Sequence, residues 1–284
     1  MGKKVENLLE IKDLKVCFQT ENGLVQALRN VSFEVRQGEV LALVGESGCG
    51  KSVTALSVMG LLPQPQGIIS GGSIHFQGRD LVRLPRKELR KYTGNEISMI
   101  FQEPMTSLNP VYTVGYQICE AIRQHSRINK KAVRDHTIEM LDKVGVAEAG
   151  KRFNAYPHQL SGGMRQRVMI AMALSCNPRL LIADEPTTAL DVTIQAQILE
   201  LMIELNQRIG MSMIMITHDL GVVAEIAERV AVMYAGRIVE TSQVVPLFTN
   251  PSHPYTWGLL GSMPWVDREQ ERLSPIAGIV PNPF

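Results

Sequence analysis

A glycine-rich loop between an apolar run and a helical pattern constrains this chain more than any other feature. Residues 45–52 read Gly-Glu-Ser-Gly-Cys-Gly-Lys-Ser and fit the pattern G-x-x-x-x-G-K-[ST] at every fixed position. The run Val40–Val44 before the loop is typical of a strand, and Ser52–Leu62 after it is typical of a helix. Glycines let successive backbone N–H groups face phosphate oxygens, and the helix N-terminus adds a positive dipole end. The sequence therefore predicts an α/β fold with a nucleotide phosphate site, against the alternative of a glycine-rich turn with an exposed lysine.

The residues of this phosphate loop (residues 45–52) have distinct expected contacts. Lys51 is expected to reach the β- and γ-phosphates, and the Ser52 hydroxyl is expected to bind Mg²⁺. The residues that we expect to line the nucleotide at this point are Gly45, Glu46, Ser47, Gly48, Cys49, Gly50, Lys51, Ser52 and Val53.

Composition argues against several classes of protein. The 284 residues suffice for one large domain or two smaller ones, and a hydrophobic content of 45% is ample for a buried core. Twenty-nine basic and 28 acidic residues give a net charge of +1, so we expect no broad positive surface for nucleic acid. No apolar run is long enough to span a bilayer, and the N-terminus lacks the apolar core of a signal peptide. We expect a soluble cytosolic chain with reduced cysteines that form no metal site: Cys17, Cys49, Cys119 and Cys176.

The order of strand and helix patterns predicts an antiparallel layer, a helical region and a parallel sheet. Short strand patterns without an intervening helix precede the phosphate loop, which favours an antiparallel layer. Helical periodicity dominates residues 112–145 and 161–176, and apolar runs alternate with helices after that. Beyond about Pro246 the chain is rich in proline, and we expect a poorly regular extension. The predicted strands are residues 8–18, 25–28, 31–35, 40–44, 73–76, 97–101, 180–183, 211–216, 230–233 and 236–240.

Polar residues directly follow three of the predicted strands. Asp184 is placed to hold Mg²⁺ at the end of its strand, and Glu185 to polarise an attacking water as a general base. The alternative is a pair of acids that merely caps the strand before a turn. His218 is a candidate for the γ-phosphate and the water, although a helix-capping or core histidine competes with that role. Gln102 can reach the metal or the water through its amide, but a lone glutamine carries no signal.

A second segment rich in small residues opens the helix predicted after residue 160. It reads Leu-Ser-Gly-Gly-Met-Arg over residues 160–165, and small residues at a helix start leave N–H groups available to a phosphate. Its other interpretation is an ordinary N-cap with Ser161 as the capping residue. Because the phosphate loop already accounts for one phosphate-binding helix end, two such ends in one chain favour a nucleotide shared between two chains.

In this order, these motifs resemble the ATPase subunits of ABC transporters. The resemblance covers about residues 8–245 and includes Ala189-Leu190-Asp191 after the acidic pair. It implies a P-loop NTPase with a RecA-like core, an antiparallel β-subdomain and an α-helical subdomain at about 104–178. The domains would be a nucleotide-binding domain over 1–250 and a proline-rich C-terminal extension over 251–284.

The resemblance also implies roles for individual residues. Two subunits would close head to tail around ATP, with the phosphate loop of one facing Ser161, Gly162, Gly163 and Met164 of the other. Phe18 would stack on adenine, unless it is a core phenylalanine, and Asp191 would lie at the dimer interface. Mg²⁺ would be bound by Ser52, Gln102 and Asp184, with Glu185, His218 and Gln102 as the catalytic residues.

Two shorter stretches resemble the oligopeptide, dipeptide and nickel importers within this family. They are Phe101–Pro110 and the sequence Asn-Pro-Ser-His-Pro-Tyr-Thr over residues 250–256. In many relatives the proline-rich tail continues into a cysteine cluster. This sequence has no cysteine after Cys176, so either it is truncated or it lacks the cluster, and we expect no metal cluster.

The resulting hypothesis is an ATPase subunit that powers di- and oligopeptide import from the cytoplasmic face of the membrane. Its partners would be a second ATPase subunit, identical or different, integral membrane permease subunits and, indirectly, an extracytoplasmic solute-binding protein, but no nucleic acid. The alternatives are a nickel or other small-solute importer, a non-transport ATPase of the same family, and a degenerate subunit that hydrolyses ATP poorly. The intact Glu185 and His218 argue against the last of these.

Overall fold

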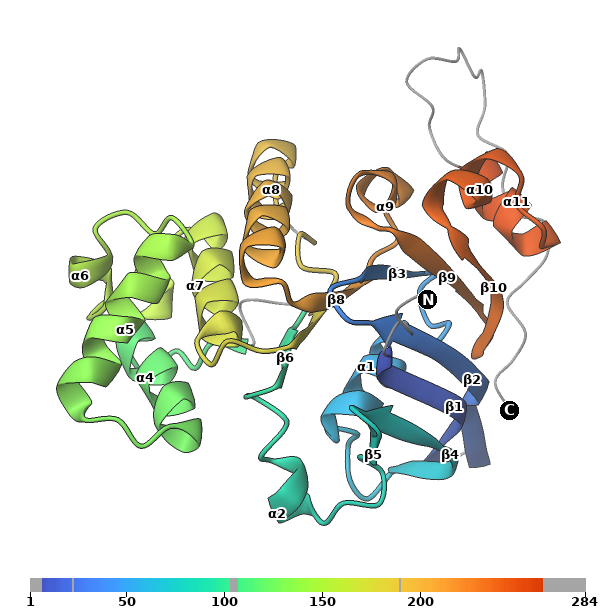
Figure 1. The fold of residues 1–284 in the computed structure, drawn as a ribbon, viewed down its shortest axis with the longest axis horizontal. Helices are drawn as coiled ribbons and strands as arrows, with labels where there is room; N and C mark the ends of the chain where they lie inside the picture. Colours follow the sequence, from blue (N-terminus) through green and yellow to red (C-terminus); the bar gives the residue numbers. More distant parts are fainter. Residues whose placement is uncertain (1–6, 22, 103–106, 189, 263–284) are drawn as a thin grey trace, which may run out of the picture. The chain divides into compact units, whose positions relative to one another are not determined.

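The structure, a computed structural model, describes residues 7–21, 23–102, 107–188 and 190–262 (Figure 1). The chain divides into two compact units. The first unit comprises residues 1–84 and 214–284, and the second unit comprises residues 85–213.

The first unit contains an antiparallel sheet with the strand order β2-β1-β4-β5 (Figure 1). Its strands are β1 (Asn7–Thr20), β2 (Gly23–Arg36), β4 (Gly67–Phe76) and β5 (Arg79–Asp80). The predicted antiparallel layer is therefore present, with residue 20 paired to residue 23 in a tight hairpin between β1 and β2.

Two strands of this layer are longer than the sequence predicts, because irregular positions interrupt them without ending them. The expected turn at Asn30 lies inside β2, where Asn30 has φ +59° and the register with β1 shifts. The glycine-rich stretch 67–72 belongs to β4, and Gly72 has φ +85° where a Cβ would lie 2.5 Å from the Asp13 carbonyl oxygen. Both positions are bulges that bend a strand while the pairing continues.

The first unit also contains the strands that carry the phosphate loop. β3 (Val40–Val44) pairs in parallel with β9 (Arg229–Tyr234), which pairs in antiparallel with β10 (Arg237–Gln243). All five residues of β3 are buried, as is typical of a parallel strand covered on both faces. The C-terminal part of β8 (Ser212–Ile216) lies on the other side of β3. The helices of this unit are α1 (Lys51–Met59), α9 (Leu220–Ile226), α10 (Val244–Thr249) and α11 (Pro254–Gly261).

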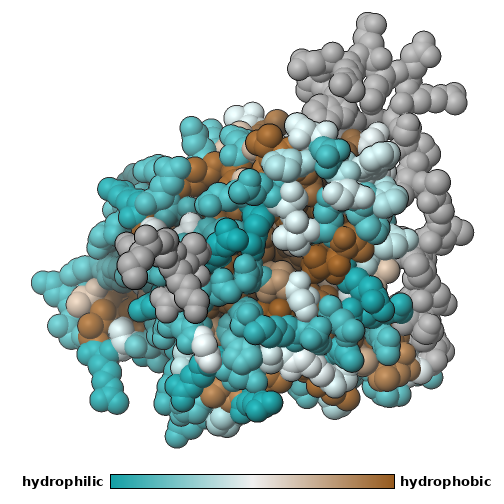
Figure 2. Space-filling model, turned by 45° about the vertical axis from the view of Figure 1, so that its right-hand side comes forward, coloured by the Kyte–Doolittle hydropathy of each residue, from teal (hydrophilic) through white to brown (hydrophobic). Residues whose placement is uncertain are grey.

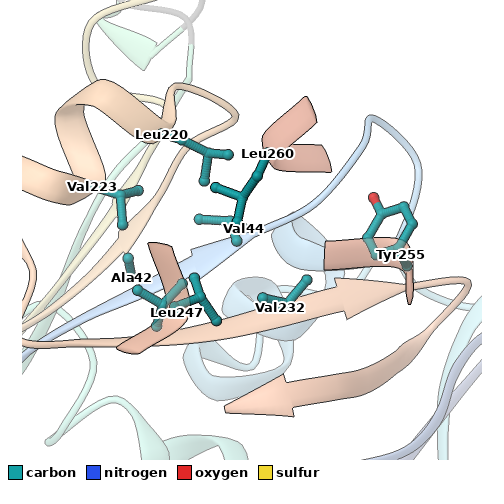
Figure 3. Close-up of a cluster of buried hydrophobic side chains, with 9 residues drawn as sticks. Ala42, Val44, Leu220, Val223, Val232, Leu247, Tyr255 and Leu260 are labelled. Carbon is teal, nitrogen blue, oxygen red and sulfur yellow. The ribbon is translucent and has the colours of Figure 1, made fainter. Parts of the chain in front are cut away.

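A hydrophobic cluster holds the C-terminal helices of the first unit against its sheet (Figure 3). Ala42 and Val44 of β3 and Val230 and Val232 of β9 supply its sheet side. The helices contribute Leu220 and Val223 from α9, Leu247 from α10, and Tyr255 and Leu260 from α11. The prediction of a poorly regular chain beyond residue 246 is therefore wrong for the described part, because α11 buries apolar side chains in this core. The local sequence also supports α11, with His253 as N-cap and Pro254 as the first helical residue.

The second unit combines two parallel strands with a group of helices. β6 (Ile97–Ile100) pairs in parallel with β7 (Leu180–Asp184), and the N-terminal part of β8 follows β7. Side chains of Thr113, Asn129, Ser161 and Asp191 accept the N-capping hydrogen bonds of four helices. The helical segments are α2 (Arg86–Leu89), α4 (Val114–His125), α5 (Lys130–Lys143), α6 (Ala149–Arg152), the 3₁₀ turn Pro157–Gln159, α7 (Gly162–Leu174) and α8 (Val192–Ile209).

Within the described residues, no helix has the length and apolar character that crossing a membrane requires. On the face drawn in Figure 2, hydrophobic side chains lie in small groups among hydrophilic ones.

Candidate functional site

The backbone of the phosphate loop depends on three glycines with positive φ. Gly45, Gly48 and Gly50 have φ of +150°, +78° and +110°. A Cβ on Gly45 would lie 2.1 Å from the Met233 carbonyl oxygen, and one on Gly50 would lie 2.7 Å from a methyl group of Leu28. A Cβ on Gly48 would meet no described atom within 4 Å. Packing therefore fixes both ends of the loop against the protein, while its middle faces open space.

Lys51 reaches back across the loop that precedes it. Its side chain is 5% exposed, and Nζ donates hydrogen bonds to the carbonyl oxygens of Gly45, at 2.7 Å, and Glu46, at 2.9 Å. Burial raises the pKa of the nearby Cys49 thiol, and this outweighs the Lys51 ammonium, which lowers it. The thiol therefore stays neutral and does not cancel the lysine charge. The third N–H of this buried ammonium faces Cys49 Sγ at 3.9 Å, a weak acceptor that an anion can replace.

The start of α1 also fits an anion. Among the described residues, the backbone N–H groups of Gly48, Gly50, Lys51 and Ser52 form no hydrogen bond to a protein group. Gly50 is the N-cap and provides no side chain to satisfy them. Unsatisfied N–H groups at a helix start, together with the Lys51 ammonium, are what phosphate oxygens require.

In the second unit, the ends of β6 and β7 bring Gln102 and the acidic pair together. Because Ile100 pairs with Ala183, the two parallel strands end at the same edge. Asp184 is the last residue of β7 and is 4% exposed. Glu185 has φ +45°, and its Oε2 accepts hydrogen bonds from Gln102 Nε2, at 2.9 Å, and from Thr188 Oγ1, at 3.0 Å.

This arrangement suits proton transfer and a hard cation. Glu185 has an uncommon positive φ for a non-glycine residue, and its carboxylate contacts Gln102 at this edge. Since the Gln102 amide nitrogen faces the carboxylate, its amide oxygen is available to another ligand. The predicted metal ligands Asp184 and Gln102 here and Ser52 in the first unit offer only oxygen atoms, the donor set that Mg²⁺ prefers.

The serine–glycine segment (residues 161–165) opens α7 in the second unit. Ser161 is the N-cap, and its Oγ accepts a hydrogen bond from Met164 N–H at 3.3 Å, so the capping interpretation holds. A Cβ on Gly163 would lie 2.8 Å from Ile194 Cγ2 of α8, whereas a Cβ on Gly162 would approach only Leu190 Cδ2, at an ordinary 3.8 Å, among the described atoms. Packing therefore explains Gly163 and leaves the exposed Gly162 unexplained.

A buried glutamine connects this helix with the turn after the acidic pair. The Nε2 group of Gln166 donates a hydrogen bond to the Pro186 carbonyl oxygen. Asp191 caps α8 by accepting from Ile194 N–H at 2.9 Å, and its side chain is exposed. The second unit therefore contains the serine–glycine segment, the acidic pair, Gln102 and Asp191.

His218 and Phe18 lie in the first unit. His218 follows β8 and is exposed, and the residue that caps α9 is Asp219, which accepts from Gly221 and Val222 N–H. Both competing interpretations of His218, as a cap and as a core residue, are therefore wrong. Phe18 is half-buried on β1, where its ring edge would lie 3.0 Å from a Cβ on Gly67. A fully buried core position is excluded for Phe18 as well.

Sequence reasoning did not connect Tyr255 with the phosphate loop. Its hydroxyl accepts a hydrogen bond from Glu46 N–H at 3.1 Å. The only available signal was the Asn-Pro-Ser-His-Pro-Tyr-Thr stretch, whose spacing does not say what the tyrosine contacts. Part of the predicted importer motif, residues 103–106, lies outside the described residues, as does Ala189.

Comparisons with known sequences give two family matches. Residues 28–188 match the family described as ABC transporter, and residues 239–284 match the one described as oligopeptide/dipeptide transporter, C-terminal region. The oligopeptide transport ATP-binding protein OppD of Bacillus subtilis (strain 168) is 57% identical over 280 residues, which are 98% of this chain and 78% of that protein. The dipeptide transport ATP-binding protein DppD of Escherichia coli (strain K12) is 52% identical over 277 residues, covering 98% of this chain and 84% of its own.

Solved structures are similar as well. The dimeric structure of a post-hydrolysis state of the ATP-binding cassette MJ0796 bound to ADP and Pi has a TM-score of 0.74 and 27% identity, covering 83% of this chain and 98% of that one. The structure of cbiO1 from Clostridium perfringens, part of the cbiONQ transporter complex, has a TM-score of 0.71 and 27% identity, covering 86% of this chain and 92% of that one.

Proposed function

Because this chain belongs to the ABC transporter family of ATPases, we propose that it binds ATP with Mg²⁺ and hydrolyses ATP to drive the import of di- and oligopeptides. The predicted family and the predicted fold class, a P-loop NTPase of the ABC type, are confirmed by the family match and the solved cassettes. The observation that carries the substrate class is the 57% identity over 98% of the chain to an oligopeptide transport ATP-binding protein. The match of residues 239–284 to the oligopeptide/dipeptide transporter C-terminal region supports it.

In the proposed site, the first unit binds the phosphates. Lys51 and the N–H groups at the start of α1 attract phosphate oxygens, since the ammonium is buried and held toward the loop by two carbonyl oxygens. His218 lies exposed at the end of β8, where it can donate a hydrogen bond to the γ-phosphate. Phe18 provides a half-exposed aromatic ring for the adenine.

In the second unit, Glu185 is the proposed general base. Its carboxylate accepts a proton from the attacking water, while Gln102 and Thr188 hold that carboxylate through Oε2. Ser52, Asp184 and Gln102 are the residues that we propose to hold Mg²⁺, which, when bound, neutralises charge on the phosphates. His218 and Gln102 position the water in this proposal.

We further propose that a second subunit completes the site. Ser161, Gly162, Gly163 and Met164 of that subunit would bind the γ-phosphate, and Asp191 would lie at the interface. The support is the exposed Gly162, whose missing side chain permits the close approach of a phosphate although no packing contact requires it. The domain limits belong to the same proposal: a nucleotide-binding domain over 1–250, with a helical subdomain at about 104–178, and an extension over 251–284.

The proposed partners are integral membrane subunits and, through them, an extracytoplasmic solute-binding protein, with the chain at the cytoplasmic face of the membrane. A nickel importer is the second candidate, but the names of the relatives favour peptides. The balanced net charge of +1 gives no support to a nucleic-acid partner.

The test is capture of the transporter from its own membranes through a tag on this chain. We expect integral membrane subunits to co-purify. The ATPase activity of that complex should rise when a solute-binding protein loaded with a di- or oligopeptide is added, and not when the same protein carries Ni²⁺. Stimulation by Ni²⁺ alone would transfer the proposal to the nickel importers. Capture of ribosomes or nucleic acid in place of membrane subunits would contradict import altogether.

A further inference from the structure

The stretch Asn250–Thr256 builds the start of α11 around one carboxylate. Glu240 on β10 accepts hydrogen bonds from the backbone N–H groups of Ser252, at 2.7 Å, and His253, at 3.0 Å. The His253 ring Nδ1 then accepts from Tyr255 N–H at 3.1 Å and caps the helix. The carboxylate and the histidine therefore fix the backbone from which the Tyr255 side chain projects.

The Tyr255 ring is anchored by apolar packing. Tyr255 is 7% exposed and belongs to the hydrophobic cluster of the first unit, in which Figure 3 shows it at the margin. Its ring centroid lies 4.4 Å from that of Tyr234, the last residue of β9, at an interplanar angle of 38°. A ring held on both sides keeps its hydroxyl in one place at low entropic cost.

That hydroxyl contacts the phosphate loop at its first peptide unit. Glu46 N–H donates to Tyr255 Oη at 3.1 Å, and the Gly45 carbonyl of the same peptide unit accepts from Lys51 Nζ at 2.7 Å. The C=O and N–H of a trans peptide point in opposite directions, so Tyr255 and Lys51 hold the two ends of one plane. Rotation of that plane would break both hydrogen bonds and leave the Lys51 ammonium with the Glu46 carbonyl as its one remaining oxygen partner among the described residues.

A second contact from the same region holds the other end of the loop. The Gly236 N–H, in the turn between β9 and β10, donates to the Cys49 carbonyl oxygen at 2.9 Å. The loop between these two points contains Gly48 at φ +78°, and no described atom lies within 4 Å of the position that a Cβ would take there. Glycine makes this stretch flexible, so the contacts at its ends determine which loop conformations are populated.

We propose that Tyr255 is a positioning residue for the phosphate loop, because its hydroxyl holds the Gly45–Glu46 peptide plane in the orientation that aims Lys51 at the phosphates. This inference rests on the proposed function, since it assumes that the loop binds ATP. It assigns a task to the Asn-Pro-Ser-His-Pro-Tyr-Thr stretch: the C-terminal region holds the nucleotide site in its binding conformation. Burial raises the pKa of Tyr255 to about 12, so the hydroxyl remains neutral over the working range of pH.

The test compares two variants that each lose one hydroxyl. Tyr255→Phe keeps the packed ring and removes the contact with Glu46. Tyr234→Phe is the matched control, because its ring packs against that of Tyr255 at a tilted angle and its hydroxyl has no hydrogen bond within the described part of the chain. We expect Tyr255→Phe to bind Mg-ATP about 3- to 10-fold more weakly, the effect of one ordinary hydrogen bond on the population of the binding conformation. Tyr234→Phe should bind within about twofold of the unmodified chain.

The outcomes separate this inference from the proposed function. If the unmodified chain and Lys51→Ala are alike in showing no binding of Mg-ATP, the proposed function fails. If the unmodified chain binds ATP and Tyr255→Phe binds it equally well, the positioning role fails and the function stands. A lower unfolding temperature of Tyr255→Phe with unchanged affinity would show a purely structural tyrosine and would also overturn the inference.

Amide hydrogen exchange in the unmodified chain tests the same contact if Tyr255→Phe does not fold. A peptide fragment that reports the Glu46 amide should exchange slowly before any nucleotide is added, because its N–H is bonded to a buried hydroxyl. Exchange at the rate of an exposed loop amide would overturn the inference.

Discussion

Replacing Gly45 with alanine tests the phosphate loop at its tightest point. A Cβ at Gly45 would lie 2.1 Å from the Met233 carbonyl oxygen and 2.9 Å from Cys49 Sγ, at φ +150°. Unfavourable backbone conformations cost about 1–3 kcal/mol, and overpacking typically adds about 1–3 kcal/mol. We therefore expect Gly45→Ala to lower the free energy of unfolding by roughly 2–6 kcal/mol. At about 2–4 °C for each kcal/mol, the unfolding midpoint should fall by roughly 5–20 °C.

Two other glycines provide matched controls for this substitution. Gly48, in the loop, and Gly38, in the turn before β3, have φ of +78° and +77°, and at neither would a Cβ meet a described atom within 4 Å. In their alanine variants the free energy of unfolding should fall by only about 1–2 kcal/mol, which is the cost of the left-handed backbone conformation for a residue with a Cβ. Gly48→Ala should also weaken ATP binding, because its Cβ would lie where the phosphates are proposed to bind, whereas Gly38→Ala should not.

Thermal unfolding without nucleotide, followed by circular dichroism, measures the three stabilities, and titration with Mg-ATP measures the affinities. Gly45→Ala should be clearly the least stable of the three variants. Equal midpoints for Gly45→Ala and Gly38→Ala would refute the close approach to Met233. Equal loss of ATP affinity in Gly48→Ala and Gly38→Ala would refute the placement of the phosphates.

Two further predictions concern carboxylates. Glu185→Gln keeps an amide oxygen that can accept hydrogen bonds from Gln102 and Thr188, but the amide cannot accept a proton from water. ATP turnover should therefore fall about 10²- to 10⁴-fold, while ATP binding persists and size-exclusion chromatography shows an ATP-dependent dimer. Unchanged turnover would exclude Glu185 as the base. At Glu240, burial raises the pKa, but hydrogen bonds that include those from Ser252 and His253 N–H outweigh it and hold the pKa below the ordinary 4.5, so its stabilisation is present above that value and is lost as the pH falls through the lowered pKa. Glu240→Gln should therefore be less stable than the unmodified chain by about 1 kcal/mol near pH 7, and the difference in unfolding midpoint should shrink below about pH 4; a difference that grows toward acid would contradict this sign.

Local patterns were sufficient to predict the elements that carry the site. The continuous apolar runs at β3 and β7 are short and bounded by turn residues, so their limits follow from the sequence to within a residue. Gln102 and Glu185 could be placed at one edge because each lies within two residues of the end of a strand in the same parallel sheet, and the structure joins them at 2.9 Å. In a parallel sheet, residues that follow different strands lie at the same edge, so their proximity can be predicted from the sequence.

Contacts between distant parts of the chain could not be predicted in this way. Tyr255 and Glu46 are 209 positions apart, and no period or spacing relates them. The bulges at Asn30 and Gly72 depend on which neighbouring strand approaches each residue, so they were taken for strand ends. Glu240, from another element, binds the N–H groups of Ser252 and His253, the two residues that directly precede α11. Proline content alone indicated an irregular chain at that point.

The glycines separate what the fold requires from what a ligand requires. Gly45 and Gly50 have a positive φ and also lie too close to neighbouring atoms for a Cβ. Gly48 has only the positive φ, and Gly163 has only the close approach to Ile194. Gly162 has neither a positive φ nor a close contact among the described atoms, and it is the first residue of α7 after the N-cap. Ser161 is fully explained as an N-cap, so the capping interpretation accounts for the serine and not for the glycine beside it. Packing among the described atoms gives no reason for the exposed Gly162, and the proposed dimer offers one, because a nucleotide shared with a second subunit would approach its backbone closely.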